Sequence, residues 1–109
     1  MIKHKMNIRY VVARNRLRKD NRIPIYIRIT INNMRKQFSS GHFVKYKNWN
    51  SKTQSVEPPE PDAELINTQL SLIKTKLSQA FLFLQVKGSD FNVHDIYKQY
   101  KGETPKMEL

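Results

Sequence analysis

An alternating run of isoleucines constrains the fold of this chain more than any other feature. Residues 23–31 read Ile-Pro-Ile-Tyr-Ile-Arg-Ile-Thr-Ile, with an isoleucine at every odd position. Period-two alternation in a segment rich in β-branched residues predicts a strand with one buried face. The even positions, which are Pro24, Tyr26, Arg28 and Thr30, are expected on the opposite, exposed face.

A tight hairpin is predicted directly after this strand. Asn32 and Asn33 can adopt the positive φ angles of a two-residue type I′ turn. Such a short loop fixes the register of the returning strand. The expected cross-strand pairs are Ile31 with Met34, Thr30 with Arg35, Ile29 with Lys36, Arg28 with Gln37, Ile27 with Phe38 and Tyr26 with Ser39. Parity places Lys36 on the apolar side, where its stem can extend to the rim of the sheet.

Further elements flank the hairpin on both sides. Residues 7–14 predict a first strand with Ile8, Tyr10 and Val12 facing the core, after a basic arm at residues 1–6. Gly41 is expected to break the third strand, and the sheet should span about residues 7–44. Residues 51–61 form a connector, because the prolines at its end forbid a helix. Trp49, just before the connector, is expected to plug the junction between sheet and helix.

Two helices are predicted in the second half. Residues 62–87 should form a long helix, with Asp62 as N-cap and Gly88 as its stop. Its apolar positions are Ile66, Leu70, Ile73, Leu77, Ala80, Phe81 and Leu84, with Leu65, Leu72 and Phe83 widening the stripe. Residues 92–100 should form a short helix, capped by Asn92 with Asp95 three residues on. The predicted fold is therefore α+β: a three-stranded antiparallel sheet packed on one long C-terminal helix, plus a short second helix.

The charge is concentrated on the sheet half of the chain. The 109 residues suit one domain and carry a net charge of +11. Residues 1–55 hold fourteen Lys and Arg against one acid, and every arginine lies there. A membrane-surface protein would carry such charge on an amphipathic helix, whereas here it falls on strands and loops. This distribution indicates nucleic acid as the partner.

Other function classes find little support. No cysteine is present, which suits an intracellular protein, and no apolar run is long enough for a membrane span. The histidines His4, His42 and His94 have no companion ligands at metal spacing. The acids Glu57, Glu60, Asp62 and Glu64 cluster at the start of the long helix, where capping and solubility explain them. We therefore expect no catalytic residue, metal, cofactor or small-molecule substrate in this chain.

The exposed strand face supplies the candidate DNA contacts. Arg, Gln and Thr can read base edges in the major groove, and a small sheet fits that groove. The base-reading candidates are Arg28, Thr30, Arg35 and Gln37, with Tyr26 at the rim and Arg9 on the neighbouring strand. The phosphate candidates are Arg14, Arg16, Arg18, Lys19, Arg22, Lys36, Lys45 and Lys47. The alternative for this face is a merely solvated surface.

Several segments together resemble a known family. They are Pro24–Thr30, Arg35–Gly41, the stretch ending in Trp49-Asn50, Ile66–Leu70, and Asp95-Ile96 with Tyr100–Gly102. In order and spacing the chain resembles the N-terminal arm-type DNA-binding domain of tyrosine recombinases from Bacteroides-type mobile elements, the integrases of conjugative and mobilisable transposons. The resemblance departs mildly from the family pattern at Asn33 and Ser40, and it covers nearly the whole chain.

The resemblance implies a specific role. Residues 1–102 would be an arm-binding domain in the bacterial cytoplasm, and residues 103–109 the start of a linker to domains not present. The sheet would enter the major groove of arm sites on double-stranded DNA, during DNA integration and recombination. Other recombinase subunits would be further partners through the long helix, and the catalytic residues would lie outside this chain. Tyr97 and Tyr100 are not the nucleophile, because no arginine follows Arg35.

Two rival functions remain open at this point. A double-stranded RNA-binding module has a comparable arrangement of strands, helix and basic loops. A protein-interaction module would instead use the long helix to bind a partner protein, with its basic face solvated.

Overall fold

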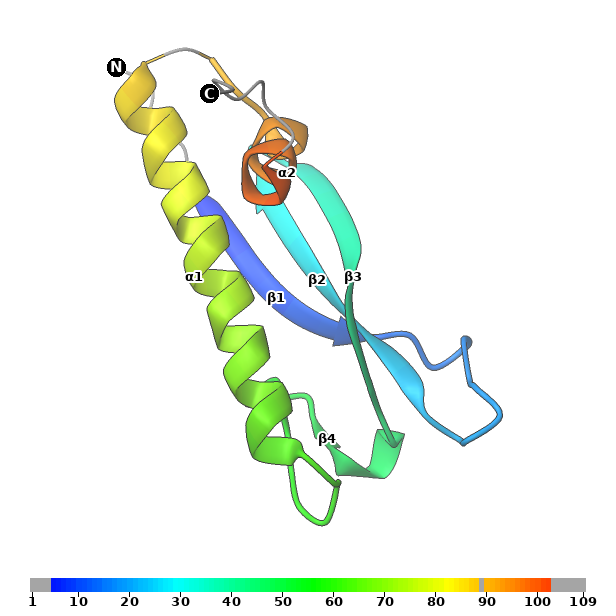
Figure 1. Cartoon of the computed structure of the whole chain (residues 1–109). Helices are drawn as coiled ribbons and strands as arrows, with labels where there is room; N and C mark the ends of the chain where they lie inside the picture. Colours follow the sequence, from blue (N-terminus) through cyan, green and yellow to red (C-terminus); the bar gives the residue numbers. More distant parts are fainter. Residues whose placement is uncertain (1–4, 89, 103–109) are drawn as a thin grey trace.

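A computed structural model describes residues 5–88 and 90–102. Most of the predicted basic arm at residues 1–6, and the predicted linker at residues 103–109, lie outside these residues. The elements are β1 (Met6–Val12), β2 (Ile23–Ile31), β3 (Met34–Val44), a 3-10 turn η1 (Tyr46–Asn48), β4 (Trp49–Asn50), β5 (Ser55–Val56), α1 (Ala63–Lys87) and α2 (Val93–Lys101). The predicted fold class is confirmed: α1 runs along one face of the β1-β2-β3 sheet, and α2 lies over one of its ends (Figure 1).

The sheet has the predicted register. All six expected pairs between β2 and β3 are present, from Ile31 opposite Met34 to Tyr26 opposite Ser39. The turn residues Asn32 and Asn33 have φ angles of 50° and 69°, as a type I′ turn requires. On the other side, β1 pairs antiparallel with β2 and places Ile8 opposite Ile29. The inward residues of all three strands therefore share one face.

The isoleucines of β2 form the centre of the core. Toward the α2 end, Ile27, Ile29 and Ile31 are buried in one cluster whose other buried members are Leu77, Ala80, Val93 and Ile96. Toward the other end, Ile23 and Ile25 are buried in a second cluster with Val44, Val56, Ile66 and Leu70. One strand thus supplies the centre of both clusters, and α1 crosses both.

Three apolar residues of α1 depart from the prediction. Leu65, Leu72 and Phe83 do not widen the buried stripe, since they are 54%, 46% and 51% exposed. Leu82 and Val86 of the same helix are also exposed. A helix on the surface of a small sheet buries only the narrow face that the sheet can reach.

Gly41 does not break the third strand. β3 continues to Val44, and its register against β2 shifts between Pro24 and Tyr26, which marks a β-bulge. Gly41 has a φ of +83°, and the Ser40 hydroxyl donates a hydrogen bond of 2.7 Å to the Ile25 carbonyl. The side chain of Ser40 therefore satisfies a backbone group that the ladder leaves open, and the strand bends instead of ending.

The connector is more ordered than its prolines suggest. β4 and β5 pair across a short turn, with Trp49 opposite Val56, and Trp49 packs half-buried against the second cluster as predicted. Asn67 on α1 accepts from the Val56 N–H and donates to the Val56 carbonyl, both at 2.8 Å. Gln54 accepts a 2.8 Å hydrogen bond from the Tyr10 N–H on the free edge of β1. These two amide side chains tie the connector to the helix and to the sheet.

The two predicted helix caps differ in outcome. Asn92 and Asp95 form the predicted capping box at the start of α2. Asp62 is the N-cap residue of α1, but its φ is 62° and its side chain accepts no capping hydrogen bond. The prediction that its carboxylate caps the helix was therefore wrong.

We expect two leucines of α1 to contribute differently to the free energy of unfolding, because they differ in burial. Leu77→Ala should lower the free energy of unfolding by about 2–5 kcal/mol, because Leu77 is fully buried in the cluster that joins α1 to α2 and the sheet. Leu82→Ala, at a position 60% exposed, should change it by less than about 0.5 kcal/mol. Urea denaturation of both variants measures the difference, and similar values would contradict the packing described above.

Asn67 should be structural despite its place on a helix surface. Asn67→Ala leaves the N–H and carbonyl of buried Val56 without their partner, and should cost about 1–3 kcal/mol. The neighbouring Thr68, whose hydroxyl donates within its own helix to the Glu64 carbonyl, provides the control. Thr68→Ala should be nearly neutral in the same denaturation experiment, and an equal loss in both variants would argue against the Asn67 tie.

Candidate nucleic-acid interface

The face of the sheet opposite α1, here called the outer face, is built from three cross-strand rows. Each row takes one residue from each of β1, β2 and β3. The rows are Asn7–Thr30–Arg35, Arg9–Arg28–Gln37 and Val11–Tyr26–Ser39. The structure therefore brings all six base-reading candidates onto one surface. Asn7, Val11 and Ser39 share it but were not among the candidates, although the same alternation could have found them.

The electrostatics of the outer face favour an anionic partner. Arg9 lies directly opposite Arg28, and like charges at opposed positions destabilise a sheet. None of the three strands contains an Asp or Glu that could compensate. Arg28 donates from Nε to Oε1 of Gln37 at 3.1 Å, which orients both side chains across the middle row. Arg and Gln side chains can each form a pair of hydrogen bonds with a base edge, and here the two are held side by side.

The loop at residues 13–22 carries Arg22, which is described below, and four further phosphate candidates, Arg14, Arg16, Arg18 and Lys19. All four are exposed, and the loop extends beyond the end of the sheet that lies away from α2 (Figure 1). The guanidinium carbon of Arg14 lies 4.1 Å from the ring centre of Tyr46, and that of Arg18 lies 4.2 Å from the ring centre of Phe43. Two of the loop arginines are therefore stacked on aromatic rings.

The remaining phosphate candidates are in different settings. Arg22 forms an ion pair with Glu60, with 2.7 Å between Nη2 and Oε2. Lys36 lies on the helix side of the sheet, as parity predicted, with its ammonium 4.8 Å from the ring centre of Tyr97. Lys45 and Lys47 are exposed, Lys45 just before η1 and Lys47 within it. The structure thus separates Lys36 from the outer face.

Glu60 overturns the explanation given for the acidic cluster. Its side chain is fully buried, so it contributes neither to solubility nor to capping. Oε1 accepts hydrogen bonds from the Asn48 side chain at 2.8 Å and from the Lys45 N–H at 3.2 Å. Nothing in the sequence distinguishes Glu60 from its exposed neighbour Glu57, because burial of one acid depends on the three-dimensional path of the connector.

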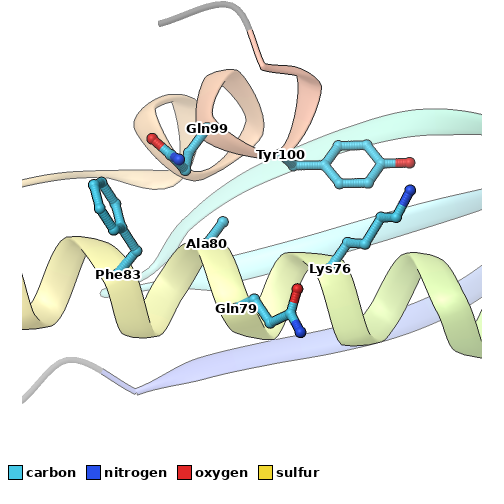
Figure 2. A pocket seen from close by; sticks show the side chains of 6 residues that line it. All are labelled: Lys76, Gln79, Ala80, Phe83, Gln99 and Tyr100. Carbon is cyan, nitrogen blue, oxygen red and sulfur yellow. The ribbon is translucent and has the colours of Figure 1, made fainter. Parts of the chain in front are cut away.

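A groove lies between α1 and α2 on the helix side of the sheet. It has a volume of about 430 Å³ and is lined by Lys76, Gln79, Ala80, Phe83, Gln99 and Tyr100. Figure 2 shows Phe83 pointing toward α2, with Lys76 extending toward Tyr100 and Ala80 between them. Burial and the adjacent Tyr97 raise the pKa of Tyr100 above its usual value. Lys76 is the one ionic group among these lining residues, so the groove presents no acid–base pair.

Within residues 5–88 and 90–102, no group of three or more His, Cys, Asp or Glu side chains is placed to hold a metal ion. Over the same part of the chain, no helix has the length and apolar character needed to cross a membrane.

Comparison with known proteins agrees with a DNA-binding role for the outer face. Searches of curated proteins and of solved structures gave no match. The family model described as "Arm DNA-binding domain" matches residues 10–97, which include β1 from Tyr10 on, the whole of β2, β3 and α1, and the first half of α2. The family binds DNA and is not a catalytic domain. On this match, and with a basic outer face of the kind described above, the chain belongs to the arm DNA-binding domain family.

Proposed function

We propose that this chain is a sequence-specific double-stranded DNA-binding module, which inserts its outer face into the major groove of arm-type sites. It would serve a site-specific tyrosine recombinase, the integrase of a Bacteroides-type mobile element, in DNA integration and recombination. The observation that carries the proposal is the acid-free outer face, with Arg28 and Gln37 joined across its middle row. The catalytic residues of such a recombinase would lie outside this chain.

The dimensions of the sheet fit this mode of binding. Three strands spaced about 4.8 Å apart span roughly 10 Å, and the major groove is about 12 Å wide. With the outer face in the groove, α1 lies on the side away from the DNA (Figure 1). The loop at residues 13–22 would then reach the phosphates beside the groove. Phosphate contacts set register and orientation, while the rows of the outer face read the bases.

The exposed apolar residues of α1 suggest a second role, in contact with another protein. Leu65, Leu72, Leu82, Phe83 and Val86 are each at least 46% exposed on this helix. Such residues support a contact with other recombinase subunits, in keeping with the rival function of a protein-interaction module. Its test is self-association that is insensitive to salt and that is lost in Leu72→Gln or Phe83→Gln. These positions suit the test, because Leu77 is fully buried and a polar residue there would unfold the chain.

Base reading by Arg35 is tested with target and random DNA. Arg35→Ala should weaken binding to a selected target site by about 1–3 kcal/mol, and random DNA by clearly less, if Arg35 reads a base. Lys87→Ala removes the same charge from the last turn of α1, and should leave discrimination between the two DNAs unchanged. An equal loss on both DNAs would assign Arg35 to a phosphate instead.

Salt dependence and helix type test the partner class. With about six phosphates neutralised, the logarithm of affinity should fall with the logarithm of salt concentration at a slope of roughly −5. Fluorescence anisotropy on a labelled DNA duplex, from about 50 to 300 mM salt, measures this slope. An A-form RNA duplex of the same sequence should bind more weakly, because side chains do not enter its narrow major groove. Equal or tighter binding to RNA would favour the RNA-binding alternative.

A further inference from the structure

A buried carboxylate lies beside the most basic loop of this protein. The Glu60 side chain is fully buried, in a chain whose net charge is +11. Burial of a charge is costly unless partners compensate it. Oε2 has no well-aligned hydrogen bond, and its counter-charge is Nη2 of Arg22 at 2.7 Å. Oε1 is satisfied by the Asn48 side chain and the Lys45 N–H.

These partners come from two separate segments. Arg22 ends the basic loop, where its carbonyl accepts a 2.8 Å hydrogen bond from the Arg18 N–H. Lys45 immediately precedes the turn η1, which begins at Tyr46 and ends at Asn48. Glu60 therefore joins the end of the basic loop to the turn that presents one of its aromatic partners.

The joined segments carry the two arginine–aromatic stacks. We call Arg14 on Tyr46 and Arg18 on Phe43 the arginine platform. A ring beneath a guanidinium covers one flat face and leaves the N–H groups at its edge free for a phosphate. Stacking also restricts a long side chain before binding, so less conformational entropy is lost when the phosphate arrives.

We infer that Glu60 is a positioning residue for DNA binding, which holds the arginine platform in place to contact the phosphate backbone beside the groove that the sheet occupies. The inference rests on the function proposed above, and assigns to a buried acid a role in binding a polyanion. Arg22 then acts through Glu60 as part of the same anchor, rather than as a phosphate contact itself.

The decisive experiment compares two single charge removals, Glu60→Gln and Glu57→Gln. Glu57 is exposed, lies three residues away, and its carboxylate bonds only the Asn50 side chain among the contacts described. Removal of either negative charge should strengthen DNA binding if net charge alone matters. We expect Glu57→Gln to leave affinity unchanged or raise it, and Glu60→Gln to lower it about tenfold, through the loss of two pre-ordered arginines.

Neutral variants of the platform test the same inference without a change of charge. Phe43→Leu and Tyr46→Leu keep all basic residues, so the salt slope should stay that of the parent chain while affinity falls about threefold in each. Tyr97→Leu is the matched control, since Tyr97 makes a comparable contact with Lys36 on the helix side of the sheet. All losses should be equal on target and random DNA, because phosphates carry no sequence information.

Folding and binding are measured together, by anisotropy at a temperature at which circular dichroism shows each variant folded. Tighter or unchanged binding by Glu60→Gln would overturn the inference, and so would parental affinity in both platform variants. The proposed function would survive that result if Arg35→Ala still lost discrimination for the target site. Absence of salt-dependent binding by the parent chain would instead reject the proposed function.

Discussion

The alternation of the central strand is the constraint on which the rest of the structure depends. A strand sends successive side chains to opposite faces, so burial of five isoleucines from β2 forces Tyr26, Arg28 and Thr30 outward. Pro24, expected to be exposed, is buried instead, beside the β-bulge. Both neighbouring strands pair in register with β2, and their polar residues follow onto the same outer face. The hydrophobic core thus determines on which face Arg9, Arg28 and Arg35 lie. Folding and presentation of the basic surface are one event.

Much of this arrangement was predictable because it depends on local rules. The alternation of Ile23–Ile31, the Asn32-Asn33 turn and the capping box of Asn92 each act within a few residues, and each was read correctly. The bulge at Gly41 was missed, because a glycine that ends a strand and one that kinks it look alike in sequence. The connector was missed for a different reason. Its order comes from Gln54 and Asn67, which bond segments far away along the chain.

In the candidate site, too, the features set by local rules were predictable and those set by distant contacts were not. Parity alone placed the Arg28 and Arg35 rows on one face, and it also placed Lys36 on the other. Sequence reasoning assigned Arg14, Arg18 and Arg22 alike to phosphates, since no local pattern shows which partner each arginine contacts. The structure separates them by their partners: a buried acid for Arg22, and aromatic rings for the other two. A charge count treats these arginines as equivalent, although their surroundings differ.

The hydrogen bond from the Tyr10 N–H to Gln54 also bears on how copies of this domain behave when crowded. β1 is an edge strand, and its unpaired backbone groups could accept a strand from a neighbouring molecule. Gln54 occupies one of these donors with a side-chain oxygen, so an incoming strand would have to displace it. Domains bound at neighbouring sites along one DNA molecule are brought to high local concentration. The blocked edge favours their remaining separate sheets that can each dissociate, instead of fusing into one continuous sheet.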